Sequence, residues 1–295
     1  MTTTSIKGIL PAVPTPITSS FEPDIPRLID LCTELLAQGA HGLNITGTTG
    51  EATSMSVNQR RAIIEGLAKS NLPKDQMMFG TGAASVADAV QLTGCLGENG
   101  FQRSLVLPPF YFKDPSQDGL VSYFARVVDA AASNDTGVYL YNFPALSGVA
   151  FDVPLLTRLK SEFGNRIVGL KDSSGDVEYA RTAATTFPGL DVYPSNEGTL
   201  FEARNGPFAG CISATANLSA NSCAQAFENG DENALKRAIS VRKIVAEGPL
   251  VPRTKALLAS DRNDESWCRV LPPYSELNAA DRDTLTAKVG EARAR

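Results

Sequence analysis

The 295-residue sequence predicts an α/β fold, a TIM (β/α)₈ barrel with a C-terminal helical extension. Short apolar runs rich in β-branched residues alternate with longer segments of helical period, which is typical of βα units and a parallel sheet. Eight such runs follow one another at nearly regular spacing, and a barrel of roughly 250 residues with an appendage fits the chain. A doubly wound sheet is the alternative, and it requires strands that leave in two directions.

Each apolar run is expected to form a strand followed by a helix. In chain order the runs are Gly8–Ile17, Gly42–Gly47, Met77–Gly82, Ser104–Pro109, Gly137–Asn142, Ile167–Asp172, Asp191–Asn196 and Gly210–Thr215. Helix start signals support this alternation, because side-chain oxygens at Asp24 and Ser85 can accept hydrogen bonds from free amides of the helices that follow.

The last part of the chain has helical periodicity without intervening strands. Its helical segments are expected around Asp231–Glu247, Val251–Ser260 and Ala279–Ala294. We therefore expect residues 1–225 to form the barrel and residues 226–295 to form helices packed on one side of it. No linker, low-complexity stretch or longer internal repeat indicates a second structural domain.

The composition excludes several classes of function. A net charge of -5 without a basic patch argues against nucleic acid or an anionic membrane as a partner. No apolar stretch approaches the roughly 20 residues of a membrane-spanning helix. The segment Met1–Lys7 lacks the apolar core of a signal peptide, and the cysteines form no Cys-x-x-Cys pair, so we expect a cytoplasmic protein with reduced thiols.

His41 is the only histidine of the sequence. A sequence with one histidine excludes multi-histidine metal sites, and with the other candidate residues it argues against Ser-His-Asp triads and Cys-His dyads. We therefore expect no metal, and nothing in the sequence calls for a cofactor.

Residues that end the predicted strands are the first candidates for chemistry, because the active site of a (β/α)₈ barrel lies there. Gly47-Thr48-Thr49-Gly50-Glu51 ends the second run, and its amides and two hydroxyls can converge on an anion such as a carboxylate. Tyr141 ends the fifth run, on the same face as Tyr139, and can pass protons if other hydroxyls bond to it. Lys171 ends the sixth run, which is too apolar to lie at the surface, and burial favours a neutral, nucleophilic amine.

Each of these features has a plainer interpretation when it is taken alone. The glycine-rich segment can be an ordinary βα turn, Tyr141 a packing residue, and Lys171 a lysine that reaches the barrel rim or pairs with Asp172. Together, however, they supply an anion site, a proton carrier and an amine. Those are the groups that Schiff-base chemistry on a 2-oxo acid requires.

Four ordered motifs resemble the dihydrodipicolinate synthase and N-acetylneuraminate lyase superfamily of class I, Schiff-base aldolases over almost the whole chain. They are Gly47-Thr48-Thr49-Gly50-Glu51, Tyr141-Asn142 with Pro144, Gly169-Leu170-Lys171-Asp172, and Gly210-Cys211-Ile212-Ser213-Ala214-Thr215-Ala216-Asn217. The resemblance implies that Lys171 forms an imine with pyruvate and that Tyr141 donates and accepts protons. It further implies that Thr48 and Thr49 bind the pyruvyl carboxylate and that Ile212 lies close to the pyruvyl group.

The segment Pro109-Phe110-Tyr111 is similar to one whose tyrosine, in the family, crosses a tight dimer contact. The resemblance implies that Tyr111 of a neighbouring subunit completes a proton relay with Thr48 and Tyr141. Members of the family usually assemble as dimers of dimers, so a homotetramer is expected.

Departures from the family pattern bear on the substrate. Lysine-pathway synthases have an arginine for the aldehyde's carboxylate where this chain has Leu146, so condensation with aspartate semialdehyde requires another cation. Glu197 resembles the carboxylate with which sialic-acid lyases hold sugar hydroxyls, and Ser173 adds a hydroxyl. A stabilising charge at a helix N-terminus is the equally weighted interpretation of Glu197.

The run from Lys171 to Asp176 is more similar to members that act on 2-keto-3-deoxy sugar acids or hydroxy-oxoglutarate. We therefore expect an aldolase that joins or separates pyruvate and an aldehyde. A sugar-acid dehydratase with the same imine and a lysine-pathway synthase are the enzymatic alternatives. A catalytically silent 2-oxo-acid sensor ranks behind them because it would be expected to lose Lys171 or Tyr141, and a metal-dependent aldolase would need a ligand cluster that the sequence lacks.

Overall fold

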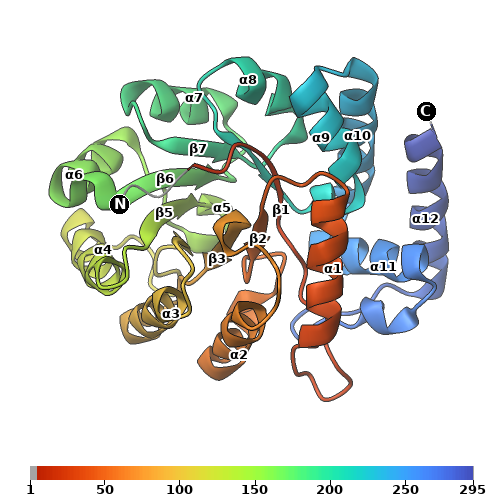
Figure 1. The fold of residues 1–295 in the computed structure, drawn as a ribbon, viewed down its shortest axis with the longest axis horizontal. Coiled ribbons are helices and arrows are strands. Elements are labelled where there is room, and N and C mark those ends of the chain that lie inside the picture. The colour runs from red at the N-terminus through yellow and green to blue at the C-terminus, as the bar shows by residue number, and fades with distance from the viewer. Residues whose placement is uncertain (1–4, 295) are drawn as a thin grey trace.

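The computed structural model describes residues 5–294, and Met1–Thr4 of the N-terminal segment lie outside them. Its central feature is a set of parallel strands surrounded by helices (Figure 1). The strands are β1 (Gly8–Pro11), β2 (Leu43–Ile45), β3 (Met77–Gly80), β4 (Arg103–Val106), β5 (Gly137–Asn142), β6 (Ile167–Asp172), β7 (Asp191–Pro194) and β8 (Gly210–Ser213). Each lies within or next to one predicted run, which confirms the predicted (β/α)₈ barrel.

Hydrogen bonds close the strands into a ring. β2 to β7 pair in chain order, and β1 pairs with β8, always in parallel. Backbone bonds also bridge the two remaining gaps, from His41 N to Ile9 O at 3.0 Å and Val13 N to Asn44 O at 2.9 Å between β1 and β2, and from Ala209 N to Val192 O at 2.9 Å between β7 and β8. The ring therefore has no open edge that would need protection from other chains.

Helices separate successive strands, and all but the short α5, which lies at the cavity, cover the outside of the barrel (Figure 1). They are α1 (Ile25–Ala37), α2 (Val57–Ala68), α3 (Val86–Glu98), α4 (Gln117–Ala132), α5 (Pro144–Ser147), α6 (Val153–Phe163), α7 (Val177–Thr186), α8 (Leu200–Asn205) and α9 (Ala220–Asn229). As predicted, Asp24 and Ser85 cap α1 and α3, accepting hydrogen bonds from Arg27 N and Asp88 N.

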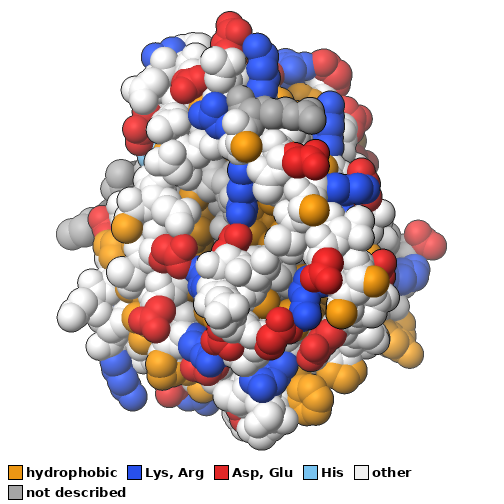
Figure 2. All heavy atoms as spheres, turned by 90° about the vertical axis from the view of Figure 1, so that its right-hand side faces the viewer, with side chains coloured by type: hydrophobic (Ala, Val, Ile, Leu, Met, Phe, Trp, Pro, Cys, Tyr) orange, Lys and Arg blue, Asp and Glu red, His pale blue; other side chains and the backbone are white. Residues whose placement is uncertain are grey.

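Three further helices follow the barrel and form the predicted C-terminal extension. They are α10 (Glu232–Val245), α11 (Leu250–Arg262) and α12 (Ala279–Ala294), and they pack against one another beside α9 and α1 (Figure 1). Figure 2 shows this side of the molecule, where acidic and basic side chains are interspersed. Ion pairs such as Arg293–Asp261 and Lys288–Glu247 account for part of that pattern.

The register between β5 and β6 decides which side chains meet inside the barrel. Tyr139 lies beside Gly169, Tyr141 beside Lys171, and Asn142 beside Asp172. Because side chains alternate along a strand, Tyr141 and Lys171 point into the barrel while their successors point outwards. In residues 5–294, no helix is both long enough and apolar enough to cross a lipid bilayer.

Candidate active site

A cavity of about 350 Å³ opens at the C-terminal ends of the strands. Its wall contains the predicted site residues Thr48, Thr49, Tyr141, Lys171, Ser173 and Ile212. They come from the ends of four different strands, β2, β5, β6 and β8, and meet only because the barrel is closed. The fold therefore gathers most of the predicted site residues around one space.

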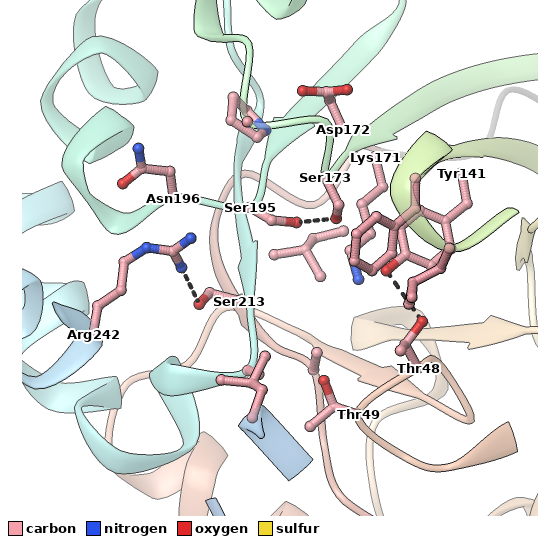
Figure 3. Close-up of a pocket in the computed structure, with 18 of the residues that line it drawn as sticks. Thr48, Thr49, Tyr141, Lys171, Asp172, Ser173, Ser195, Asn196, Ser213 and Arg242 are labelled. Carbon is pink, nitrogen blue, oxygen red and sulfur yellow. Dashed lines mark hydrogen bonds between the residues drawn. The ribbon is translucent and has the colours of Figure 1, made fainter. Parts of the chain in front are cut away.

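Lys171 is the penultimate residue of β6, is 3% exposed, and directs its amine into the cavity (Figure 3). Its Nζ lies 4.3 Å from the centroid of the Tyr141 ring and donates a long hydrogen bond of 3.4 Å to Asn44 Oδ1. Within residues 5–294, no carboxylate lies within ion-pair distance of this amine, so the pairing with Asp172 considered from the sequence does not form. The nitrogen is held by weak contacts and remains accessible to a ligand.

Asp172 is turned away from Lys171 and is bound by its own neighbours. Asn142 Nδ2 donates to Asp172 Oδ1 at 2.6 Å, and Ser174 Oγ donates to Oδ2 at 2.9 Å. Burial raises the pKa of this carboxyl, while the hydrogen bonds from Asn142 and Ser174 oppose the rise. Since Asn142 also accepts from Phe151 N, the outward faces of β5 and β6 are fixed by polar bonds that leave the inward faces for chemistry.

Tyr141 forms the side of the cavity next to Lys171. Its hydroxyl is joined to Thr48 Oγ1 by a hydrogen bond of 3.3 Å (Figure 3). Thr49 lies next to Thr48 in the cavity wall, and Ile212 contributes from β8. A phenol bonded to a hydroxyl beside a free amine is a suitable arrangement for moving a proton to or from a group held on that amine.

The loop that carries Thr48 and Thr49 has a constrained backbone. Glu51 adopts φ +58°, and a side chain at Gly50 would meet Val13 O at 3.1 Å and Thr15 Oγ1 at 3.2 Å. Glu51 is completely buried, where it pairs with Lys255 of α11 and accepts from Leu271 N at 2.6 Å. The C-terminal extension thereby fixes the position of the two threonines.

Ser173 lies at the cavity mouth and binds Ser195, with 2.7 Å between their hydroxyl oxygens (Figure 3). Backbone bonds continue beyond the strands here, from Ser173 N to Asn142 O and from Ser195 N to Asp172 O, both 2.8 Å. These bonds hold the loops after β5, β6 and β7 together. The mouth is therefore a defined surface with two adjacent hydroxyls.

Glu197 lies behind the cavity wall, outside its lining, with no exposed surface. Its Oε1 accepts from Ser213 Oγ at 2.6 Å and from Thr215 Oγ1, and its Oε2 accepts from Arg242 Nη1 at 3.0 Å. The protein's own donors thus engage this carboxylate. Its predicted contact with substrate hydroxyls stays a prediction.

Two residues of the site were not identified from the sequence. Asn44 lies beneath Lys171, and its Nδ2 is buried without a hydrogen-bond partner among the described residues. Arg242 reaches the cavity from α10, about 45 residues beyond Glu197 in the chain. An asparagine inside an otherwise apolar strand could have indicated the first, but no local pattern distinguishes Arg242 from its helix's other cations.

Part of the cavity wall is apolar. Phe143, Leu146, Leu250, Val251 and Tyr274 line it. Leu146 sits on α5, and because its side chain is apolar it cannot pair with a carboxylate as the arginine of lysine-pathway synthases does. The described cations in the lining are Lys171 and Arg242, at different places in it.

Tyr111 lies apart from the cavity of its own chain. Its side chain is 76% exposed and stacks edge-on against Phe112, which is 79% exposed, with 5.3 Å between ring centroids. The chain's own fold therefore does not bring Tyr111 to Tyr141 and Thr48. The proposed relay through a neighbouring subunit stays a prediction.

Known proteins share the sequence pattern and the fold of this chain. The model of the dihydrodipicolinate synthetase family matches residues 5–290. An uncharacterized DapA-like lyase of Chloroflexus aurantiacus is 33% identical over 272 residues, which is 90% of this chain and 88% of that protein. A 4-hydroxy-tetrahydrodipicolinate synthase of Rhodospirillum centenum is 35% identical over 202 residues, covering 66% of this chain and 67% of that protein.

The solved structures include a similar protein with a bound 2-oxo acid. The prophage protein YagE of E. coli K12, of the dihydrodipicolinic acid synthase family and in complex with pyruvate, superposes with a TM-score of 0.86. It is 25% identical, and the match covers 97% of this chain and 98% of that one. The fold similarity thus extends through the barrel and the C-terminal extension.

Proposed function

The chain belongs to the dihydrodipicolinate synthetase family and is a lyase, and we propose on that premise that it joins or separates pyruvate and an aldehyde through a Schiff base on Lys171. The observation that carries the proposal is the geometry of Lys171. Its amine is buried in the cavity, lacks a carboxylate partner among the described residues, and lies beside the Tyr141–Thr48 pair. The complex of YagE with pyruvate supports this class of ligand.

In the proposed cleavage, the neutral amine of Lys171 attacks the C2 carbonyl of a 4-hydroxy-2-oxo acid, and loss of water gives an iminium. Tyr141 removes the proton of the C4 hydroxyl, and the C3–C4 bond breaks with its electron pair moving into the iminium. The aldehyde leaves, and an enamine remains on Lys171. Protonation of the enamine at C3 and hydrolysis then release pyruvate and restore the amine.

Thr48 and Thr49 are proposed to hold the pyruvyl carboxylate, with Ile212 beside the pyruvyl group. Both threonines line the cavity on a loop whose backbone is fixed by the buried Glu51–Lys255 pair. A rigid loop suits this task, because a 2-oxo acid must be held in one orientation while its C2 carbon meets the amine. Thr48 additionally orients the Tyr141 hydroxyl.

The proposed substrate is a 2-keto-3-deoxy sugar acid or a related hydroxy-2-oxo acid. The adjacent hydroxyls of Ser173 and Ser195 at the mouth support a hydroxylated tail. Detection of a released aldehyde would distinguish this aldolase from a dehydratase that acts on a similar acid. Lysine-pathway synthesis is the alternative favoured by the name of the Rhodospirillum centenum relative, and it predicts condensation of pyruvate with aspartate semialdehyde.

A homotetramer is proposed in which Tyr111 of a neighbouring subunit completes the relay. The exposed ring pair of Tyr111 and Phe112 supports a protein contact at this place, because such adjacent aromatic surface is more often covered than solvated. Sedimentation of the native protein tests the assembly. A monomer with full activity would contradict both the tetramer and the role of Tyr111.

Borohydride reduction in the presence of pyruvate, followed by peptide mass analysis, tests the proposed function. We expect one reduced adduct, on Lys171, and none in Lys171→Ala. Lys255 serves as an internal control because it is equally buried but paired with Glu51. If pyruvate binds without any adduct, the imine mechanism is wrong and the sensor becomes the better hypothesis.

A further inference from the structure

A second cation, Arg242, stands in the cavity on the side away from Tyr141 (Figure 3). Figure 3 shows Tyr141 and Thr48 at one side, Arg242 and Asn196 at the other, and the Lys171 side chain nearer the first. The arginine side chain is 33% exposed, so its guanidinium meets the cavity rather than the protein core. The pocket thus has a cationic end that the chemistry at Lys171 does not use.

Contacts with Glu197 and Ser213 hold this guanidinium in place. Nη1 donates to Glu197 Oε2 at 3.0 Å and has a longer contact of 3.4 Å with Ser213 Oγ. Glu197 is itself fully buried and bound by Ser213 and Thr215, so the carboxylate that holds Arg242 is fixed on its other side. Across residues 5–294, Nε and Nη2 of Arg242 have no hydrogen-bond partner. A guanidinium presents its donors as a planar fork that matches a carboxylate, and this fork is only partly used.

We propose that Arg242 binds a carboxylate at the end of the substrate remote from the imine, so that the aldehyde fragment carries an acidic group. This inference rests on the proposed function, since it assumes that the 2-oxo end occupies Lys171 and Thr48–Thr49. Ser195, Asn196 and Ser213 line the cavity near Arg242 and add hydrogen-bonding groups. The substrate is then a 2-oxo dicarboxylic acid rather than an acid with a neutral tail.

The composition of the remaining wall supports this assignment. Leu146, Phe143, Leu250 and Val251 also line the cavity, and their side chains are apolar and uncharged. An anionic group on the substrate therefore finds its complementary charge at Arg242, held there by Glu197. A structural role alone, in which Arg242 only neutralises Glu197, predicts no preference between acidic and neutral tails.

The test compares 2-oxo acids of equal chain length with and without a terminal carboxylate, such as 2-oxoglutarate with 2-oxopentanoate and 2-oxoadipate with 2-oxohexanoate. Borohydride trapping is titrated by intact mass, and the half-saturating concentrations are compared as a ratio. A hydrogen bond to a charged group contributes about 1.5–3 kcal/mol. We therefore expect the diacid of the better-fitting length to saturate at a concentration at least about tenfold lower.

Variants assign the preference to the guanidinium. Arg242→Gln should abolish it, Arg242→Lys should retain part of it because the charge remains without the fork, and Lys243→Gln should retain all of it. Lys243 is the matched control because it is the next residue of α10 but is exposed. If Arg242→Gln is too unstable to be trapped, the comparison of Arg242→Lys with the wild type decides.

The outcomes separate this inference from the proposed function. If pyruvate is trapped but diacids are not preferred, or if neither Arg242 variant changes the preference, the proposed role of Arg242 is wrong and the imine mechanism stands. A preference for the acids with neutral tails would mean that the end of the substrate remote from the imine contacts the apolar wall instead. Absence of any adduct with pyruvate would overturn the imine mechanism itself.

Discussion

The two ends of the barrel each contain a tyrosine of β5, one buried in the core and one lining the open cavity. Tyr139 and Tyr141 lie two residues apart on β5 and point into the same interior. Towards the N-terminal ends of the strands, Tyr139 is completely buried and donates to Asp191 Oδ2 at 3.1 Å. At the C-terminal ends, Tyr141 lines the open cavity, and among residues 5–294 its hydroxyl bonds to Thr48 alone.

The difference arises on the neighbouring strand. Tyr139 lies beside Gly169, and a Cβ there would come within 2.2 Å of its ring, so glycine makes the space in which this phenol packs. Tyr141 lies beside Lys171, whose long side chain keeps the ring at the cavity wall. Burial raises the pKa of Tyr139 well above that of an ordinary phenol, which makes it unsuited to proton transfer. One strand therefore carries a structural and a functional tyrosine, distinguished by the residues beside them.

The largest expected effect is on the rate when Tyr141 is changed to phenylalanine. Loss of a positioned acid–base group typically costs about 10²- to 10⁴-fold in rate, and we expect kcat to fall within that range. The fold should be almost unaffected, because within the described part of the chain the lost hydroxyl makes one bond, of 3.3 Å, to Thr48. Kinetic assays on the aldol reaction, with urea unfolding of the same samples, measure both quantities.

Tyr139→Phe is the matched control and should behave in the reverse way. It removes one donor from the half-buried Asp191 carboxylate, which retains Ser5 Oγ at 2.7 Å, so we expect a loss of about 1–3 kcal/mol in stability. Its kcat should stay within a few-fold of the wild type. Equal losses of rate in both variants would show that Tyr141 acts through packing rather than through its hydroxyl.

The two most buried lysines extend the comparison from tyrosines to amines. Lys255 pairs with Glu51 and donates to Arg269 O at 2.8 Å, whereas Lys171 has no carboxylate partner in the described chain. Burial lowers the pKa of Lys255, and Glu51 opposes that change. Lys255 therefore serves the structure, while Lys171 remains available for a ligand.

Replacing each lysine by methionine should separate these roles. Lys255→Met leaves Glu51 buried without its cation, a change that costs about 3–5 kcal/mol in comparable pairs. Lys171→Met removes an amine held by weak contacts, so the unfolding free energy should change by about 1 kcal/mol or less. Urea unfolding gives both values, and a larger loss for Lys171→Met would contradict this assignment.

The fold could be predicted from the sequence because each strand and helix is encoded locally. Alternation of apolar runs with helical periods gave eight strands that the structure confirms, and Asp24 and Ser85 marked helix starts correctly. Strand ends were less accurate: the first run extended to Ile17, but β1 ends at Pro11. An apolar residue does not reveal whether its backbone bonds to a neighbouring strand or enters a loop.

The site could be predicted where its residues stand at the strand ends and not where they come from elsewhere. Thr48, Tyr141 and Lys171 lie at or just beyond the C-terminal ends of three strands, so closure of the barrel brings them together. Arg242 belongs to α10, and its approach to the cavity depends on how the C-terminal extension packs and on its contact with the buried Glu197. Such tertiary placement has no local sequence pattern.

The smallest predicted effect concerns pH and lies at the N-terminal end of the barrel. His41 Nδ1 accepts a hydrogen bond from Ile9 N at 3.2 Å, which requires that Nδ1 carry no proton, so this bond favours the neutral imidazole. The other ring nitrogen, Nε2, lies 3.2 Å from Glu228 Oε1. Burial lowers the pKa of His41 below its usual 6.5, and Glu228 opposes the shift. The unfolded chain therefore binds a proton at this residue more readily than the folded chain does.

The contribution of His41 to the free energy of unfolding is therefore fully present above about pH 6.5, and it is lost as the pH falls through the lowered pKa of the folded state. His41→Asn retains an acceptor for Ile9 N but does not titrate in this range, so the difference in unfolding free energy between wild type and variant should decrease on acidification. Urea unfolding across this pH range measures it, while the catalytic end, which contains no histidine, should show no matching change in pyruvate trapping. A difference that is constant with pH would mean that His41 remains equally protonated in both states.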